Sequence, residues 1–347
     1  MDPRSRGDVS STLMLAPREL PLDRHPAAVY LSRLAQGPGR RGMRRALNIA
    51  ASSITAGQAN AERLAWHRLE YQHTAGMLAA VTEKKYAPAT VNLIRSAIRG
   101  ALKEAWRLGL MTAEQYQRAV DLPRARGKTV PKGRALELAE LRALLQVCRD
   151  DRTIAGARDA AFIGIGYGCG LRQSELVALT MEDYRAGNKG EDHELLIHGK
   201  GKKERLVYLP EGASNALWEW LKFRGFNSGS MFYPVTKGGH RILNRSRLNN
   251  SNAAFYICRK RAREAGVRPF SPQDLRRSFI SHLFDAGADP STIAAMAGHA
   301  SIHTTATYDR RGDETKRKAA TLIHVPYGYS PADDDGAKPT EKITATL

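Results

Sequence analysis

The segment that decides the fold spans residues 271–308 and reads SPQDLRRSFISHLFDAGADPSTIAAMAGHASIHTTATY. Its opening predicts a helix to about Ala286, because Ser271 can cap the first turn and Pro272 suits the first helical position. An Asp-Pro pair starts a second helix, which ends near Gly298. The segment therefore places three chemically active side chains close to helix ends: Arg276, His299 and Tyr308.

Two earlier segments carry further cations. Residues 170–176 read GLRQSEL, so Arg172 follows a glycine that ends a predicted helix. Residues 195–197 and 205–209 are short apolar-rich runs on either side of a Gly-Lys-Gly-Lys-Lys sequence. That pattern predicts a β-hairpin with Lys200 in its loop.

The order of these residues resembles the tyrosine recombinase (phage integrase) family, whose signature is Arg, Lys, His-x-x-Arg, His and Tyr. The neighbouring sequences Asp-Leu-Arg, Ala-Gly-His and Thr-Thr-x-x-Tyr make the resemblance specific. It is strong over residues 135–325 and looser over residues 25–125, which look like the family's core-binding domain. The resemblance implies that the catalytic residues are Arg172, Lys200, Gln273, Arg276, His299 and Tyr308.

The chemistry of such a site follows from the residue types. A tyrosine that attacks a phosphodiester builds negative charge on the non-bridging oxygens, and two guanidiniums, Arg172 and Arg276, suit that charge. Lys200 is the candidate acid for the leaving 5′ oxygen, and His299 is expected to donate a hydrogen bond to the phosphate. The covalent 3′-phosphotyrosyl bond at Tyr308 keeps the energy of the ester, so religation needs no ATP. No metal is expected because the arginines supply the positive charge, and no other cofactor is expected.

One position departs from the family pattern. The family usually has His three residues before the second Arg, whereas this chain has Gln273. Glutamine can donate a hydrogen bond to phosphate but cannot exchange protons near neutral pH. Two nearby carboxylates have expected supporting roles: Glu175 orients the arginines or caps its helix, and Asp274 caps the helix that carries Arg276.

The fold class expected is multidomain, with an all-α N-terminal core-binding (SAM-like) domain and a mixed α+β catalytic domain. An apolar stripe from Val91 to Ala105 at helical spacing supports the first. The expected division of the chain is a flexible N-terminal arm, a helical DNA-binding domain, a basic linker, a catalytic domain and a disordered tail, over residues 1–24, 25–125, 126–134, 135–325 and 326–347.

The charge of the chain points to double-stranded DNA. It has 54 Lys and Arg against 35 Asp and Glu, a net charge of +19. Clusters of cations are candidate DNA contacts, with a solvated helix face as the alternative: Arg40, Arg41, Arg44, Arg45, Arg95, Arg99, Lys103, Arg107, Lys202 and Lys203. Arg205 is expected to contact the DNA backbone as well, and Lys202 is a second candidate acid.

The resemblance implies a site-specific recombinase or integrase that works as a dimer on each site and a tetramer in synapsis, with strand exchange through a Holliday junction. A helix over Glu314–Ile323 is expected to dock on a neighbouring protomer, and accessory directionality proteins are possible partners. The alternatives are a type IB topoisomerase-like enzyme and a catalytically weakened DNA-binding regulator. Without a signal peptide or an apolar run of about 20 residues, a cytoplasmic, nucleoid-associated protein is expected.

Overall fold

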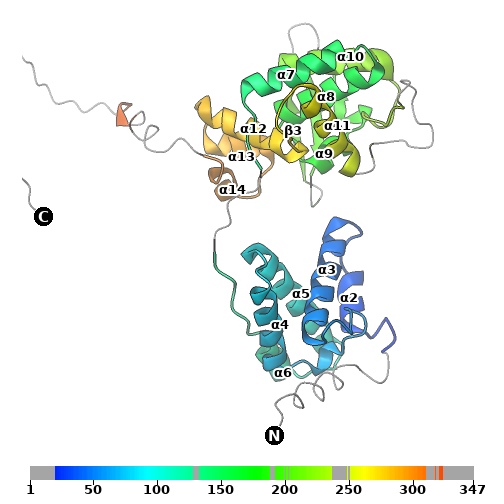
Figure 1. The fold of residues 1–347 in the computed structure, drawn as a ribbon, viewed down its shortest axis with the longest axis vertical. Helices are drawn as coiled ribbons and strands as arrows, with labels where there is room; N and C mark the ends of the chain where they lie inside the picture. The colour runs from blue at the N-terminus through cyan, green and yellow to red at the C-terminus, as the bar shows by residue number, and fades with distance from the viewer. Residues whose placement is uncertain are drawn as a thin grey trace, which may run out of the picture. The chain divides into compact units, whose positions relative to one another are not determined.

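The computed structural model describes residues 20–127, 133–187, 192–199, 201, 203–236, 248, 251–309, 317 and 320–322. The chain divides into two compact units, residues 1–131 and residues 132–347 (Figure 1). In the part of the chain that is described, every helix is too short or too polar to cross a bilayer.

Unit 1 is a bundle of helices. Its elements are α2 (Pro26–Ser32), α3 (Pro38–Ile54), the 3-10 turn η2 (Trp66–Arg68), α4 (Tyr71–Glu83), α5 (Pro88–Arg107) and α6 (Ala113–Ala119). The longest of them, α5, packs against α2, α3, α4 and α6. Its predicted apolar stripe is confirmed, because every member is buried: Val91, Ile94, Ile98, Leu102 and Ala105.

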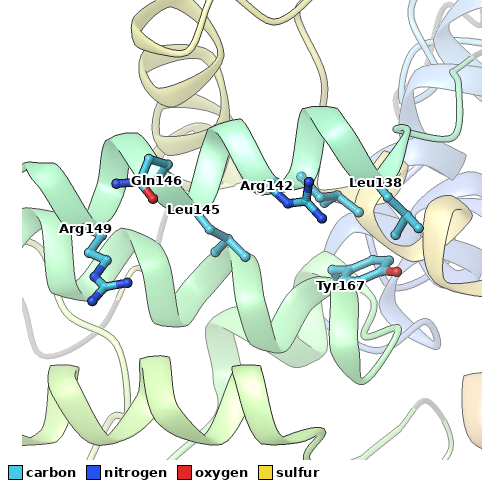
Figure 2. Close-up of a pocket in the computed structure, with 7 residues that line it drawn as sticks. Leu138, Arg142, Leu145, Gln146, Arg149 and Tyr167 are labelled. Carbon is cyan, nitrogen blue, oxygen red and sulfur yellow. The ribbon is translucent and has the colours of Figure 1, made fainter.

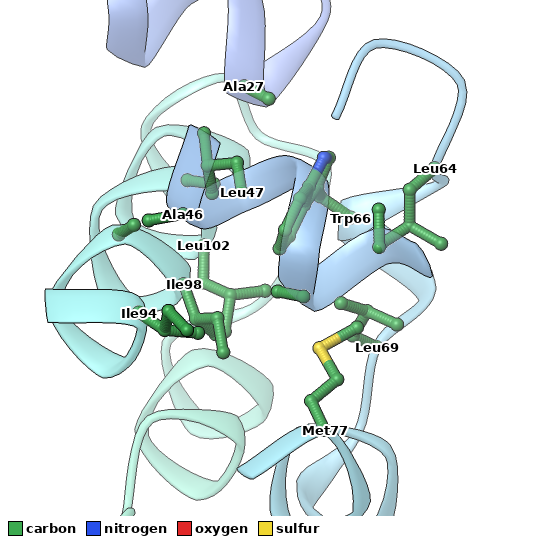
Figure 3. Packing of buried hydrophobic residues seen from close by; sticks show 14 of the residues in the cluster. Ala27, Ala46, Leu47, Leu64, Trp66, Leu69, Met77, Ile94, Ile98 and Leu102 are labelled. Carbon is green, nitrogen blue, oxygen red and sulfur yellow. The ribbon is translucent and has the colours of Figure 1, made fainter. Parts of the chain in front are cut away.

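The core of unit 1 forms around the buried indole of Trp66. Figure 3 shows Leu47 of α3 and Ile98 of α5 within the same cluster as this ring. The indole nitrogen donates to the carbonyl of Ala61 at 2.7 Å, so burial leaves no polar atom of the side chain without a partner. The apolar stripe of α5 therefore meets a single continuous core.

Unit 2 is mostly helical and contains a small sheet. Its elements are α7 (Leu138–Asp150), α8 (Ile154–Gly168), α9 (Gln173–Ala178), η3 (Met181–Asp183), β1 (Tyr184–Arg185), β2 (Glu194–His198), β3 (Glu204–Tyr208), α10 (Glu211–Arg224), α11 (Ser251–Glu264), α12 (Pro272–Asp285), α13 (Pro290–Ala297) and α14 (Ile302–Ala306). Helix α8 packs against α7, α10 and α12. The three strands are antiparallel in the order β1-β2-β3.

The predicted hairpin is confirmed as β2 and β3, which pair Leu195 with Val207 and Ile197 with Arg205. Strand β1 was not predicted, because two residues are too few for an alternating pattern to be visible. Helix α8, which ends before Arg172, starts at Ile154, because the hydroxyl of Thr153 accepts a hydrogen bond from the amide of Gly156 and caps the helix.

The predicted cap at the start of α12 is confirmed, because Ser271 and Asp274 form a capping box there with Pro272 in the first turn. Thr112 and Gln115 form a capping box of the same kind at α6. The expected N-terminal arm lies almost wholly outside the described residues, as do the expected tail, the middle of the linker and most of the helix expected over residues 314–323.

Candidate active site

Arg172 stands at the start of α9, where the chain leaves helix α8. Its backbone amide donates to Glu175 Oε2 at 3.0 Å, and its Nη1 donates to Glu175 Oε1 at 2.7 Å. Its Nη2 donates to the carbonyl of Gly298 at 2.6 Å. These contacts fix the guanidinium, yet 36% of the side chain stays exposed. Arg172 is thus a rigid cation that a ligand can still reach.

Arg276 lies in the second turn of α12, and only 1% of it is exposed. Its Nη1 donates to the carbonyl of Gly170 at 2.7 Å, which ties α12 to the loop that carries Arg172. Its Nη2 is buried without a hydrogen-bond partner among the described residues. Burial and repulsion from Arg172 lower the pKa of Arg276 to about 10, so the group stays charged at pH 7. A buried cation with an unused donor is suited to an anion.

Glu175 is the carboxylate that the cations share, and 4% of its side chain is exposed. Burial acts to raise its pKa, but hydrogen bonds from Arg205 and Arg172 outweigh burial and hold the pKa at about 2. The prediction that Glu175 orients the arginines or caps its helix is confirmed, because it does both. Two guanidiniums, those of Arg172 and Arg205, therefore donate to one carboxylate.

The guanidinium of Arg205 is turned inwards from β3. The expectation that Arg205 contacts the DNA backbone is therefore wrong. Its Nη2 and Nη1 donate to Glu175 at 2.8 and 3.2 Å, and its Nε donates to the carbonyl of Met296 at 3.0 Å. Sequence alternation could have found this, because Arg205 shares a strand face with buried Val207.

His299 and Tyr308 lie side by side. Their rings are stacked with centroids 6.1 Å apart and planes at 16°. His299 Nδ1 lies 2.7 Å from the hydroxyl of Thr305. Burial, with repulsion from Arg276 and Arg172, lowers the pKa of His299 to about 4. The imidazole is therefore neutral at pH 7.

Tyr308 is half-buried and packs at the edge of the core formed by α12 and α13. The guanidinium carbon of Arg277 lies 5.7 Å from the centroid of its ring. Helices α12, α13 and α14, drawn in orange and brown, lie together in Figure 1. The segment of residues 271–308 thus gathers Arg276, His299 and Tyr308 within one part of unit 2.

Gln273, Asp274 and the hairpin lysines complete the set of predicted residues. Gln273 is exposed in the first turn of α12, one turn before Arg276. Lys203 is exposed on the hairpin, while Lys200 and Lys202 lie outside the described residues. Asp274 caps α12 as predicted: its Oδ2 accepts from the amide and hydroxyl of Ser271 at 2.9 and 2.7 Å.

The candidate DNA contacts of unit 1 fall on α3 and α5. Arg41, Arg44 and Arg45 are exposed and Arg40 is half-buried, and Arg44 also pairs with Glu62. Lys103 and Arg107 are exposed on α5, and Arg107 Nη1 lies 2.9 Å from Glu104.

Arg95 and Arg99, also on α5, make hydrogen bonds within unit 1. Arg95 Nε donates to the carbonyl of Leu122 at 2.7 Å, and Arg99 Nη1 donates to that of Val120 at 2.9 Å. Both side chains are half-buried. They hold the segment after α6 against α5, which the sequence did not indicate.

A groove lies elsewhere on unit 2, between α7 and the end of α8. Figure 2 shows side chains of α7 on one side and Tyr167 of α8 on the other. Its lining consists of Leu138, Leu141, Arg142, Leu145, Gln146, Arg149 and Tyr167. None of the predicted catalytic residues lines it, so the groove is separate from the arginine network.

Metal ligation has no support from the described part of the chain. Among the residues that are described, no group of three His, Cys, Asp or Glu side chains is placed to hold a metal ion. The three cysteines are buried free thiols, and burial raises the pKa of Cys169 to about 12. The charge offered to a ligand comes from the arginines.

Comparisons with known proteins identify a family and several relatives. Residues 134–314 match the sequence profile of the phage integrase family. Tyrosine recombinase XerD of Rickettsia bellii is 34% identical over 219 residues, which cover 60% of this chain and 68% of the relative. Tyrosine recombinase XerC of Proteus mirabilis is 30% identical over 251 residues, which cover 70% and 75%.

Two solved structures are similar in fold. XerH site-specific recombinase bound to palindromic difH substrate, in a post-cleavage complex, has a TM-score of 0.63 at 20% identity, over 89% of this chain and 98% of that one. The Tn1549 transposon integrase in complex with transposon right end DNA has a TM-score of 0.60 at 16% identity, over 87% and 99%.

The fold, mostly helical with a small sheet, and the arginine network beside a tyrosine define a tyrosine site-specific recombinase. The chain belongs to the phage integrase family.

Proposed function

We propose that this recombinase cuts and rejoins double-stranded DNA through a covalent bond between Tyr308 and a DNA 3′ phosphate. The observation that carries the proposal is the pair of guanidiniums, Arg172 and Arg276, held by Glu175 and Gly170 in the unit that also holds Tyr308. Arg276 keeps an unused buried donor and Arg172 a partly exposed guanidinium. A phosphodiester supplies the anion and the acceptors that this arrangement lacks.

The reaction steps follow from these groups. The phenolic oxygen of Tyr308 forms a bond to phosphorus and releases its proton to water, while the bond from phosphorus to the 5′ oxygen breaks. The arginines stabilise the charge on the non-bridging oxygens, and Lys200 gives a proton to the leaving 5′ oxygen. Attack by a 5′ hydroxyl on the phosphotyrosine reverses the same steps and rejoins a strand.

His299 and Gln273 are proposed to donate hydrogen bonds to the phosphate. A Thr305 hydroxyl that donates to His299 Nδ1 places the imidazole proton on Nε2, which can then donate to an oxygen. His299 has one such N–H to give, because its lowered pKa keeps the imidazole neutral at pH 7. Gln273, exposed one turn before Arg276, offers its amide from the start of α12.

Unit 1 is proposed to be the core-binding domain, which would contact the duplex through Arg40, Arg41 and Arg45 on α3 and Lys103 on α5.

We propose that two protomers bind one site and that four form the synapse, in which strands are exchanged through a Holliday junction. The residues beyond Tyr308 are proposed to contribute to contacts between protomers. Because the proposed substrate is DNA, the enzyme is proposed to act at the nucleoid. Net charge +19 supports a polyanionic partner.

Covalent capture from a random pool tests this function and selects the target site in the same experiment. The purified chain is incubated with a pool of nicked duplexes of random sequence, and adducts that survive boiling in detergent are isolated and their DNA sequenced. We expect a selected sequence motif and an adduct that Tyr308→Phe abolishes. Absence of any adduct would support the DNA-binding regulator instead, and adducts without sequence preference, together with relaxation of supercoils, would support the topoisomerase-like enzyme.

A further inference from the structure

We infer that Arg205 is a positioning residue that balances the charge of Glu175 and so leaves Arg172 available to the scissile phosphate. The inference rests on the proposed function, since it concerns how the same phosphate site is built. It gives a role to a cation that lies on the hairpin but makes its contacts inside the protein.

The geometry of the carboxylate carries the first step. Glu175 Oε1 accepts from Arg172 Nη1 at 2.7 Å and from Arg205 Nη1 at 3.2 Å, while Oε2 accepts from Arg205 Nη2 at 2.8 Å. One buried negative charge is thus divided between two guanidiniums. Neither arginine is fully neutralised, and of the two it is Arg172 that remains partly exposed, at 36% against 14% for Arg205.

The cluster of charged groups around Glu175 has a net positive charge. Three arginines and one carboxylate, Arg172, Arg205, Arg276 and Glu175, leave a surplus of positive charge for an anion. Without Arg205, the carboxylate would pair with Arg172 alone, and the surplus at the phosphate would fall by one charge. In a buried site one charge has a large effect, because screening by water is weak.

The second step concerns the loop that leads to His299. Arg205 Nε donates to the carbonyl of Met296, and Arg172 Nη2 donates to the carbonyl of Gly298. A Cβ at Gly298 would lie 2.8 Å from Arg205 Nη1, so the loop backbone rests directly on this guanidinium. Arg205 therefore links the start of α9, the hairpin and the turn before His299.

A charge-balance cycle tests the inference. The rate of adduct formation is measured at saturating DNA, on the duplex that the wild-type chain selects from the random pool, for Arg205→Met, Glu175→Gln and the double variant. We expect Arg205→Met to slow this rate roughly ten- to a hundred-fold with little change in DNA affinity. The double variant restores the wild-type net charge, so its loss should be clearly smaller than the product of the two single losses.

Two controls separate this role from a structural one. Arg224→Met also removes an arginine that donates to backbone carbonyls, those of Gly229 and Ser230. It should lower the melting temperature as Arg205→Met does, yet leave the rate of adduct formation of the folded protein unchanged. Arg205→Lys keeps the charge and should lose less rate than Arg205→Met.

The outcomes are distinct for the two proposals. If the wild-type chain captures no duplex, the proposed function is wrong, and the inference that rests on it is wrong as well. If the wild-type chain forms the adduct but Arg205→Met matches its rate, or if the losses from Arg205→Met and Glu175→Gln simply multiply, the charge-balancing role is wrong while the function stands.

Discussion

At the scale of single residues, the site is a set of cations whose positions come from backbone carbonyls and one carboxylate. Arg276 is held by Gly170 and Arg172 by Glu175 and Gly298. Because hydrogen bonds to buried charged groups are strong and directional, the guanidiniums are placed before any DNA arrives. The substrate then accepts hydrogen bonds from the donors that have no partner among the described residues, such as Arg276 Nη2.

Substitution of Gln273 tests whether its side-chain amide donates a hydrogen bond to the phosphate. Gln273→Ala should slow cleavage by about 1.5–3 kcal/mol of transition-state stabilisation, the loss expected for one hydrogen bond to a charged group. Gln273→His should keep activity and add a limb to the pH–rate profile near pH ~6.5, where an unperturbed histidine titrates. Adduct formation by the three proteins on one nicked duplex measures both effects; an unchanged rate in Gln273→Ala would remove this residue from the site.

His299 should make stability depend on pH in a defined direction. Its pKa is lowered to about 4 in the folded chain, so between pH ~6.5 and this value the unfolded chain binds more protons than the folded one. The free energy of unfolding should therefore fall as pH falls through this window, by about 1–2 kcal/mol after allowance for partial exposure. Urea unfolding of the natural chain and His299→Gln checks this: the variant should lose that part of the pH dependence, and parallel curves would contradict the assignment.

At the scale of elements, short helices and one hairpin bring distant parts of the sequence to the same place. Helix ends were predictable from local signals, such as Ser271 and Pro272 at α12. The hairpin was predictable from two short apolar-rich runs on either side of a glycine-containing loop. Strand β1 was not predictable, because it is too short to show a pattern. The partners of Arg205 and Arg95 were not predictable either, because they lie far away in the sequence, although alternation along β3 could have indicated that Arg205 turns inwards.

Gly298 tests the contact between the hairpin and the loop before His299. It has φ +66°, and a Cβ there would press on Arg205, whereas Gly287 has φ +85° and open space around it. Alanine at either position should cost about 1–2 kcal/mol in stability through backbone strain. Only Gly298→Ala should also slow adduct formation, because it displaces Arg205. Equal rates for Gly298→Ala and Gly287→Ala would show that this contact has no bearing on catalysis.

At the scale of the whole molecule, composition and charge predicted a DNA-acting protein, and the family motif predicted its chemistry. The boundary between the compact units, between residues 131 and 132, falls within the basic segment expected to link two domains. Charge alone could not sort the cations, because Arg99 and Lys103 stand one turn apart on α5 yet only Arg99 is bound to a carbonyl of the protein. Which cations are free for DNA depends on tertiary contacts.

The salt dependence of DNA affinity measures how many of these cations neutralise phosphates. Changing Arg41, Arg45 and Lys103 together to Ala should reduce the slope of log K against log salt by roughly 0.9 for each phosphate that is no longer neutralised. Arg118→Ala is the control, since this exposed residue of α6 already pairs with Glu114 and is not proposed to meet DNA. Fluorescence anisotropy over a range of salt concentrations gives the slopes. A triple variant with the natural slope would make these side chains a solvated face.

The central claim is that Tyr308 forms the covalent bond to the DNA 3′ phosphate. Peptide mapping of the adduct tests this claim most directly. Trypsin should release residues 278–310 as one peptide, because no Lys or Arg lies between Arg277 and Arg310, and Tyr308 is its single tyrosine. After nuclease digestion of the adduct formed on the selected nicked duplex, mass spectrometry should find a nucleotide attached to this peptide through a 3′ phosphate. An adduct on any other peptide, or one that persists in Tyr308→Phe, would contradict the account.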